Sequence, residues 1–241
     1  MMLNSMRTQD VLPTNLQDPL EILRWAGRGF PKGLVLASAL GPQSIVALDL
    51  VVNAGLDVDV VLLDTGLLFD ETLELATRLE QRLGVSIERL KPALTLDEQA
   101  EALGEDLWET DPAKCCEIRK VKPLANRLAD ASAWITGLRR TGSLVRAEVE
   151  SVEWDAVHGL VKINPLAWWP RARVFEHLHS HDLPYNPLLD DGYASVGCRP
   201  CTSRVRPGED ERAGRWRGRG KTECGIHHRL AATQPREEAA Q

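Results

Sequence analysis

Short apolar runs alternate along the chain with longer stretches whose apolar residues recur at helical spacing. Residues 34–37 and 58–63 are mainly apolar runs, as in strands that are covered on both faces of a sheet. Residues 85–90 and 131–136 are expected to form the third and fourth strands. Because helices are predicted between successive strands, the pattern favours an α/β fold with a doubly wound, mostly parallel sheet.

The clearest helix prediction is an amphipathic stretch over residues 70–83, which Gly84 ends. Further helices are expected over 18–25, 45–53, 96–108, 111–120 and 171–181. Three histidines alternate on the last of these, at His177, His179 and His181. Because residues two apart on a helix point in different directions, we interpret them as surface or capping histidines, with metal binding as the minor alternative.

The predicted organisation is a single domain with an arm at each end. We expect a flexible N-terminal arm over 1–17, an α/β domain over 18–192, a segment of the same domain over 193–228, and a disordered polar tail over 229–241. The runs 145–152 and 161–163 are candidates to extend the edge of the sheet. No internal repeat and no second compact domain is evident in the sequence.

The composition of the chain limits its cellular location and the partners it can have. No apolar run approaches the roughly 20 residues that cross a bilayer, and the N-terminus lacks the apolar segment of a signal peptide. We therefore expect a cytoplasmic location, in which the five cysteines are better explained by metal binding or catalysis than by disulfides. The net charge of −6 gives no support for a nucleic-acid or membrane-surface partner.

The candidate chemistry is concentrated in residues 193–227, where three of the five cysteines lie. Between residues 204 and 221 there are seven Lys/Arg and three Asp/Glu, a local balance of +4 that suits an anion. Cys224 follows this basic stretch, and a thiol near cations ionises more easily to the nucleophilic thiolate. A lone cysteine is more often a small buried apolar residue, but the polar, glycine-rich flanks of Cys224 argue against that reading.

Small and basic residues also follow the predicted strands, at the edge where α/β sheets bind ligands. Residues 38–44 come after the first strand, 64–66 after the second, and Arg139 and Arg140 after the fourth. Backbone N–H groups at a helix start and arginine side chains both bind phosphate or sulfate. Ordinary strand–helix connections and solvated loop arginines are the competing interpretations.

Two cysteine pairs could bind metal. Cys198 and Cys201 are separated by two residues that include a proline, a spacing that brings both sulfurs to one metal. Cys115 and Cys116 are adjacent, which is poor geometry for one tetrahedral zinc but compatible with a cluster that offers several metal corners. The alternative for the adjacent pair is one surface and one core cysteine.

Taken in order, these motifs resemble an assimilatory adenylyl-sulfate (APS) reductase of the sulfonucleotide reductase family. The resemblance runs from about residue 33 to residue 227. It rests on LDTG (63–66), CCEIRK (115–120), PYNPL (184–188), GCRPCT (197–202), ERAGRW (211–216) and ECGIH (223–227).

The resemblance implies an adenine-nucleotide α-hydrolase-like fold with a modified phosphate loop and a C-terminal active-site arm. It implies one 4Fe-4S cluster on Cys115, Cys116, Cys198 and Cys201. Cys224 would be the nucleophile, with Lys120 placed between cluster and substrate and His227 as a further catalytic residue. The expected substrate contacts are Ser38, Gly41, Gln43, Asp64, Thr65, Gly66, Arg139, Arg140, Arg212 and Arg215.

The implied reaction converts APS to sulfite and AMP through a sulfonate on Cys224. If the other four cysteines hold a cluster, none remains to resolve that intermediate, so an external dithiol such as thioredoxin or a glutaredoxin-like protein is required. A homo-oligomer is compatible with the sequence.

Three alternatives stay open. Gln43 and Leu40 in the phosphate loop depart from many APS reductases, and Gln43 also fits a phosphoadenylyl-sulfate (PAPS) reductase. A zinc-stabilised, tRNA-thiolating protein would also use four metal-binding cysteines, although its S-G-G-x-D-S loop is absent. An iron-sulfur sensor would need a DNA-binding element, and the sequence has no evident helix-turn-helix.

Overall fold

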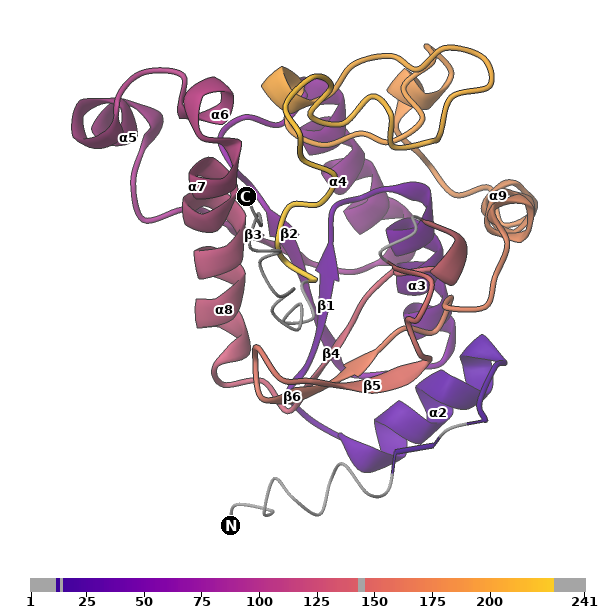
Figure 1. Cartoon of the computed structure of the whole chain (residues 1–241). Coiled ribbons are helices and arrows are strands. Elements are labelled where there is room, and N and C mark those ends of the chain that lie inside the picture. Colours follow the sequence, from indigo (N-terminus) through magenta and orange to yellow (C-terminus); the bar gives the residue numbers. More distant parts are fainter. Residues whose placement is uncertain (1–11, 14, 143–145, 228–241) are drawn as a thin grey trace, which may run out of the picture.

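A six-stranded sheet in the order β3-β2-β1-β4-β6-β5 forms the centre of the protein (Figure 1). The computed structural model describes residues 12–13, 15–142 and 146–227. Every neighbouring pair is parallel except β5 and β6. The strands are β1 (Leu34–Ser38), β2 (Val58–Leu63), β3 (Ile87–Leu90), β4 (Ala133–Ile135), β5 (Val152–Asp155) and β6 (Leu160–Ile163). The predicted α/β class and the mostly parallel sheet are therefore confirmed.

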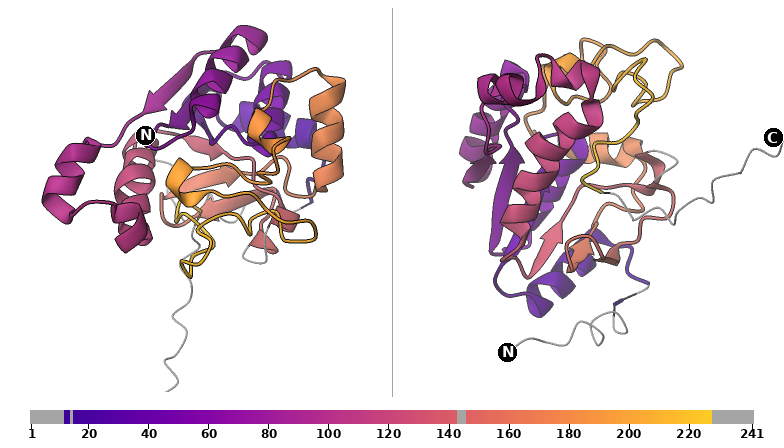
Figure 2. Two further views of the ribbon diagram at one scale, coloured as in Figure 1. Left: turned by 90° about the horizontal axis from the view of Figure 1, so that it is seen from above. Right: turned by 60° about the vertical axis from the view of Figure 1, so that its left-hand side comes forward.

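The α-helices precede, connect and follow the strands, and they cover both faces of the sheet (Figure 2). They are α2 (Pro19–Gly29), α3 (Pro42–Asn53), α4 (Asp70–Leu83), α5 (Leu96–Leu103), α6 (Leu107–Thr110), α7 (Pro112–Cys116), α8 (Lys122–Leu128) and α9 (Arg171–Ser180). A π-helical stretch, Glu117–Val121, joins α7 to α8. None of the described helices combines the length and hydropathy that crossing a bilayer demands.

Two cores lie on opposite faces of the sheet because successive strand residues point to opposite sides. Leu34 and Leu36 of β1 belong to the larger core, which α2, α3, α4 and α9 complete. Val35 lies between them on the chain and packs in the smaller core with Leu124 and Leu128 of α8. All five side chains are at most 1% exposed. A strand buried on both faces explains why residues 34–37 show no polar alternation.

Several predicted boundaries are wrong for identifiable reasons. The helix expected over 96–108 is two helices, because Gly104 and Asp106 adopt positive φ angles of 92° and 50°. The third strand begins at Ile87 and not at residue 85. Leu12 and Leu16, assigned to the flexible arm, pack against the larger core. Most of the predicted N-terminal arm, residues 143–145, residue 228 and the predicted tail 229–241 lie outside the described residues.

The histidine interpretation also needs correction. His177 on α9 and His181, the C-cap that follows α9, both contact the buried carboxylate of Asp49 on α3. His179 is exposed and His181 is the exposed C-cap of α9, as predicted, whereas His177 is partly buried.

The loop after β4 packs directly on the start of α3. A Cβ atom added to Gly137 would lie 2.8 Å from the backbone N of Ser44 and 2.9 Å from the carbonyl carbon of Gln43. Backbone atoms at these distances cannot rotate away as a side chain can. Only glycine allows these two loops to meet at the pocket described below.

Replacing Gly137 with Ala is expected to lower the free energy of unfolding by about 1–3 kcal/mol, because the new methyl group forces the two backbones apart. Urea denaturation would measure the change. The matched control is Gly29→Ala at the end of α2, where an added Cβ meets nothing within 4 Å and the better helix former should be neutral or slightly stabilising. Equal stability of the two variants would contradict the prediction.

Candidate active site

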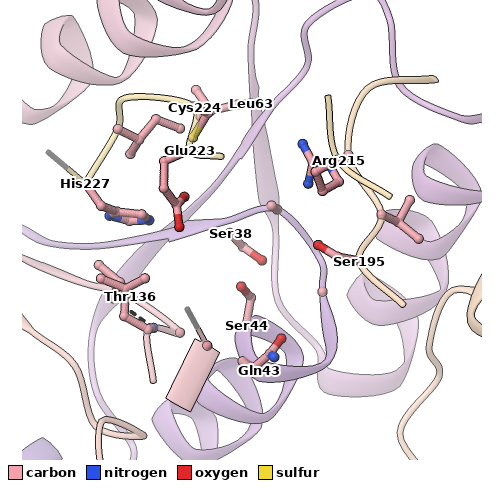
Figure 3. A pocket seen from close by; sticks show the side chains of 18 of the residues that line it. Ser38, Gln43, Ser44, Leu63, Thr136, Ser195, Arg215, Glu223, Cys224 and His227 are labelled. Atoms are coloured by element: carbon pink, nitrogen blue, oxygen red, sulfur yellow. Dashed lines mark hydrogen bonds between the residues drawn. The ribbon is translucent and has the colours of Figure 1, made fainter. Parts of the chain in front are cut away.

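The main pocket lies at the carboxyl ends of the central strands. Ser38 ends β1, Leu63 ends β2 and Thr136 directly follows β4, and all three line the pocket. We call residues 193–227 the C-terminal segment. Figure 3 shows Glu223 and Cys224 of this segment on the opposite side of the pocket from the loop that begins at Ser38. Parallel sheets bind their ligands at this edge.

The loop between β1 and α3 presents a helix N-terminus to the pocket. The Ser38 hydroxyl accepts a hydrogen bond of 3.0 Å from the Leu40 N–H, and Leu40 turns the chain with a φ of 52°. Gly41 is the N-cap of α3 and supplies no side-chain cap to the amides that follow. Gln43 and Ser44, in the first turn, line the pocket. The positive end of the helix dipole therefore favours an anion here.

Two arginines of the C-terminal segment add buried donors. Arg212 and Arg215 both line the pocket, and the Nε of each is buried without a hydrogen-bond partner among the described residues. Arg215 also makes no ion pair within that part of the chain, and its guanidinium lies 4.5 Å from the ring centre of Trp216. Because buried donors are costly to leave unpaired, this geometry favours an anionic ligand.

Glu223 fixes the backbone next to Cys224. Arg146 donates two hydrogen bonds to its carboxylate, at 2.9 and 2.8 Å, and Arg212 donates a third at 3.0 Å. The three side chains are each less than a fifth exposed, so solvent screens these ion pairs only weakly. The Cys224 side chain itself is half-buried and opens into the pocket.

A second carboxylate attaches the same segment to the body of the protein. Glu211 accepts hydrogen bonds from Arg139 at 3.1 Å and from Arg171 at 2.6 Å. The guanidinium of Arg139 is buried, so this ion pair holds the segment and leaves Arg139 little access to solvent.

Lys120 is buried between the pocket and the other thiols. Its side chain is 9% exposed and lines the pocket beside Arg215 and Trp216. Burial opposes its charge, but the thiols of Cys198 and Cys224 raise the pKa of Lys120 above its ordinary value. The ammonium group therefore stays charged at the boundary between the thiols and the pocket.

Four thiols gather beside this lysine from two distant segments. They are Cys115, Cys116, Cys198 and Cys201, each 5–7% exposed. The sulfur of Cys198 lies 3.2 Å from the Thr65 hydroxyl oxygen, and Arg219 donates a weak hydrogen bond of 3.8 Å to the sulfur of Cys201. Trp216 packs against three of the four and separates them from solvent.

The spacing of the four sulfurs is wider than that of a single-metal site. Among the described residues, the only three ligand atoms within 4.8 Å of one another belong to Asp49, His177 and His181, so no three of the thiol sulfurs are that close. A zinc ion with Zn–S bonds of about 2.3 Å would bring its sulfurs to about 3.8 Å from one another. The thiols thus fit a larger, multi-metal group better than one zinc ion.

Burial controls the protonation of these thiols in the absence of metal. It raises the pKa of Cys115 to about 12 and raises the pKa values of Cys116 and Cys201. Burial also opposes ionisation of Cys198, but Lys120 and the hydrogen bond from Thr65 outweigh it and lower that pKa. Four thiolates can share this space only with added positive charge, which a bound metal group supplies.

His227 lies against the sheet at the inner wall of the pocket. Its ring stacks on Trp134, with centroids 5.5 Å apart, and its Nδ1 is buried without a hydrogen-bond partner among the described residues. Burial, reinforced by Lys162 and Arg146, holds the pKa of His227 well below its ordinary value. The imidazole is therefore neutral at pH 7 and unsuited to act as a general acid.

The pocket contains many, but not all, of the residues that the sequence suggested. Those in its lining are Ser38, Gly41, Gln43, Lys120, Arg212, Arg215, Cys224 and His227. Asp64, Thr65, Gly66, Arg139 and Arg140 are not in the lining. Asp64 and Thr65 instead accept hydrogen bonds that shape the loop after β2, and Arg140 pairs with Glu150.

Sequence analysis missed Arg146 and Glu223 as a pair. The alternating charges of the C-terminal segment do not indicate which arginine in the preceding α/β domain contacts Glu223. Only the fold, which brings residues 77 positions apart into contact, reveals it.

The chain resembles known proteins over most of its length. Residues 33–204 match the phosphoadenosine phosphosulfate reductase domain. The chain is 46% identical to the adenosine 5'-phosphosulfate reductase of Salinibacter ruber, over 91% of this chain and 86% of that protein. It is 45% identical to the phosphoadenosine 5'-phosphosulfate reductase of Gloeobacter violaceus, over 87% and 88%.

Two solved structures are also similar to this chain. The phosphoadenylyl-sulfate reductase of Candida auris, a phosphate complex, aligns with a TM-score of 0.70 and 29% identity over 85% of this chain and 99% of that one. The FMN adenylyltransferase of Candida glabrata aligns with a TM-score of 0.57 at 13% identity, over 81% and 62%, and supports the fold alone.

Because His227 is neutral in the folded protein, we expect the free energy of unfolding to fall as the pH is lowered. A base whose pKa is lowered by folding adds stability above its unfolded pKa of about 6.5, and that stability is lost as the pH falls. Between pH 7.5 and 5.5, the wild type should therefore lose more unfolding free energy than His227→Phe, by up to about 1.4 kcal/mol per pH unit below pH 6.5. Urea denaturation at each pH measures both proteins, and all other titrating groups cancel in the difference. Equal pH slopes would show that His227 titrates normally.

Proposed function

The chain belongs to the phosphoadenosine phosphosulfate reductase family, and from that membership we propose that it reduces adenosine 5'-phosphosulfate (APS) to sulfite and AMP. One observation carries the proposal. The Cys224 thiol opens into the same pocket as the N-terminus of α3 and the unpaired Nε groups of Arg212 and Arg215. A nucleophile and donors for a charged leaving group are thus within one cavity.

In the proposed reaction, the thiolate of Cys224 attacks the sulfur atom of the sulfate group. The bond between that sulfur and the bridging oxygen breaks, and the electron pair leaves with AMP. Cys224 then carries a sulfonate. The phosphate of AMP gains charge as it leaves, and the first amides of α3 with Arg212 and Arg215 would stabilise it.

An external dithiol of the thioredoxin or glutaredoxin class would complete the reaction. One of its thiolates attacks the Cys224 sulfur, sulfite leaves with the bonding electrons, and a mixed disulfide remains. The second thiol of the reductant resolves that disulfide and becomes oxidised. The partner must supply this second thiol, because the other four cysteines of the chain are buried together away from solvent.

We further propose that Cys115, Cys116, Cys198 and Cys201 bind a 4Fe-4S cluster. Four buried thiols, spaced too widely for a single zinc ion, support this assignment. When bound, the cluster would supply positive metal charge to four thiolates and a rigid link between α7 and the turn at Cys198. Lys120 would hold its ammonium group between that link and the reacting sulfur of Cys224.

The second candidate is a PAPS reductase, because one relative of almost equal identity carries that name. The two substrates differ by a 3'-phosphate on the ribose. Gln43 lines the pocket beside Ser44 and is the residue that the sequence suggests for this choice.

Cys224 is expected to gain the mass of one sulfonate group when the protein is incubated with APS and no reductant, because the attack precedes reduction. Intact-protein and peptide mass spectrometry would detect and locate the adduct, and Cys224→Ser should remain unmodified. An adduct with PAPS but not with APS would favour the second candidate. No adduct with either substrate, from protein that retains its metal, would refute the covalent mechanism.

Anaerobically purified protein should contain about four iron atoms per chain and absorb broadly in visible light. Cys201→Ser is expected to lose most of this iron because one ligand is removed, whereas Cys224→Ser is expected to keep it. Iron analysis and absorption spectra measure both variants. Stoichiometric zinc without iron in the wild type would exclude the cluster.

A further inference from the structure

Among the described residues, one group of side chains outside the pocket has its ligand atoms as close together as a metal ion requires. It consists of Asp49 on α3, His177 on α9 and His181 at the C-cap of α9, whose ligand atoms all lie within 4.8 Å of one another. The Nε2 of His177 is 2.8 Å and the Nδ1 of His181 is 2.9 Å from the Oδ2 of Asp49. All three atoms therefore converge on one point between the two helices.

We propose that Asp49, His177 and His181 bind one divalent transition-metal ion, with Zn²⁺ as its representative, and that this ion fastens α9 to α3. Two histidines four residues apart, one in the last turns of a helix and one at its C-cap, form with a carboxylate from another element a donor set that suits zinc, cobalt and nickel. Hard cations such as Mg²⁺ prefer sites made wholly of oxygen. The site is separate from the thiols and contains no pocket residue.

The position of Asp49 supports this proposal. It is 5% exposed in a helix that is otherwise apolar from Ile45 to Val52, where an isolated carboxylate is costly to bury. Three donors share its Oδ2 atom, because the Asn53 amide also donates to it at 3.0 Å. A metal ion would compensate this buried carboxylate more completely than hydrogen bonds alone do.

The two histidine rings are also arranged face to face. Their centroids are 3.8 Å apart and their planes differ by 27°. In this arrangement, one nitrogen of each ring faces the same carboxylate oxygen of Asp49.

One side of the Asp49, His177 and His181 group faces solvent, and the other side is covered by protein. His181 has a side chain 41% exposed, which leaves room for water to complete the coordination. On the inner side, the ring of Trp169 lies 5.8 Å from that of His177. Asn53 holds the Asp49 carboxylate in orientation, as partners behind a metal ligand commonly do.

The test compares wild-type protein with His181→Ala and with His179→Ala. His179 lies on the same helix, is exposed and does not belong to the group, so its variant controls for loss of a histidine. Zn²⁺ would be titrated anaerobically into protein that retains its own metal, in competition with a chromophoric chelator. Wild type and His179→Ala should bind one more Zn²⁺ than His181→Ala, whose affinity should be at least tenfold weaker.

A second measurement locates the ion. The five cysteines are unchanged in all three proteins, so their contribution cancels when the Co²⁺ absorption spectrum of His181→Ala is subtracted from that of the wild type. The difference should show nitrogen- and oxygen-bound cobalt without a thiolate charge-transfer band, and Zn²⁺ should raise the Tm of wild type and His179→Ala only. Equal Zn²⁺ binding by wild type and His181→Ala, equal losses in both variants, or a thiolate band in the difference spectrum would each overturn the proposal.

Discussion

The ion pairs of Glu223 are the interaction on which the arrangement of the pocket depends. Within the described residues, no helix or strand follows the short turn Arg199–Cys201, so the segment that carries Cys224 has no regular structure of its own. Glu223 compensates by accepting three hydrogen bonds from Arg146 and Arg212 in a poorly solvated place. Removing one partner of such a buried pair typically costs about 3–5 kcal/mol, against less than about 1 kcal/mol for an exposed pair.

Much of the fold could be predicted from local sequence, because a strand buried on both faces needs a continuous apolar run. The runs at 34–37 and 58–63 gave β1 and β2, and the stripe that ends at Gly84 gave α4. The break between α5 and α6 could not be predicted in the same way. It depends on the backbone of Asp106, a residue that adopts a positive φ only in a particular context.

The site was predictable where motifs are short and unpredictable where contacts are long-range. The spacing of Cys198 and Cys201 indicated a shared metal group, and Cys224 was singled out by its flanks. Neither argument could show that Arg146 faces Glu223 or that Asp49 faces His177, since these pairs are 77 and 128 positions apart. The histidine pair was within reach of sequence reasoning, because its four-residue spacing alone places both rings on one helix face.

Arg119 and Lys120 are adjacent cations in the π-helical stretch that follows the cysteine pair, and they have different roles. Arg119 donates to the Thr65 carbonyl oxygen at 2.5 Å and to the Gln99 side chain at 2.9 Å, so the body of the protein satisfies it. Lys120 has no carboxylate partner in the described part of the chain, and the thiols of Cys198 and Cys224 are what favour its charge. A buried ammonium group needs a compensating negative charge, and the sulfurs of Cys198 and Cys224 supply it here. Lys120 therefore depends on the reacting sulfur and on the four-thiol group for its charge, whereas Arg119 is bound by the surrounding scaffold.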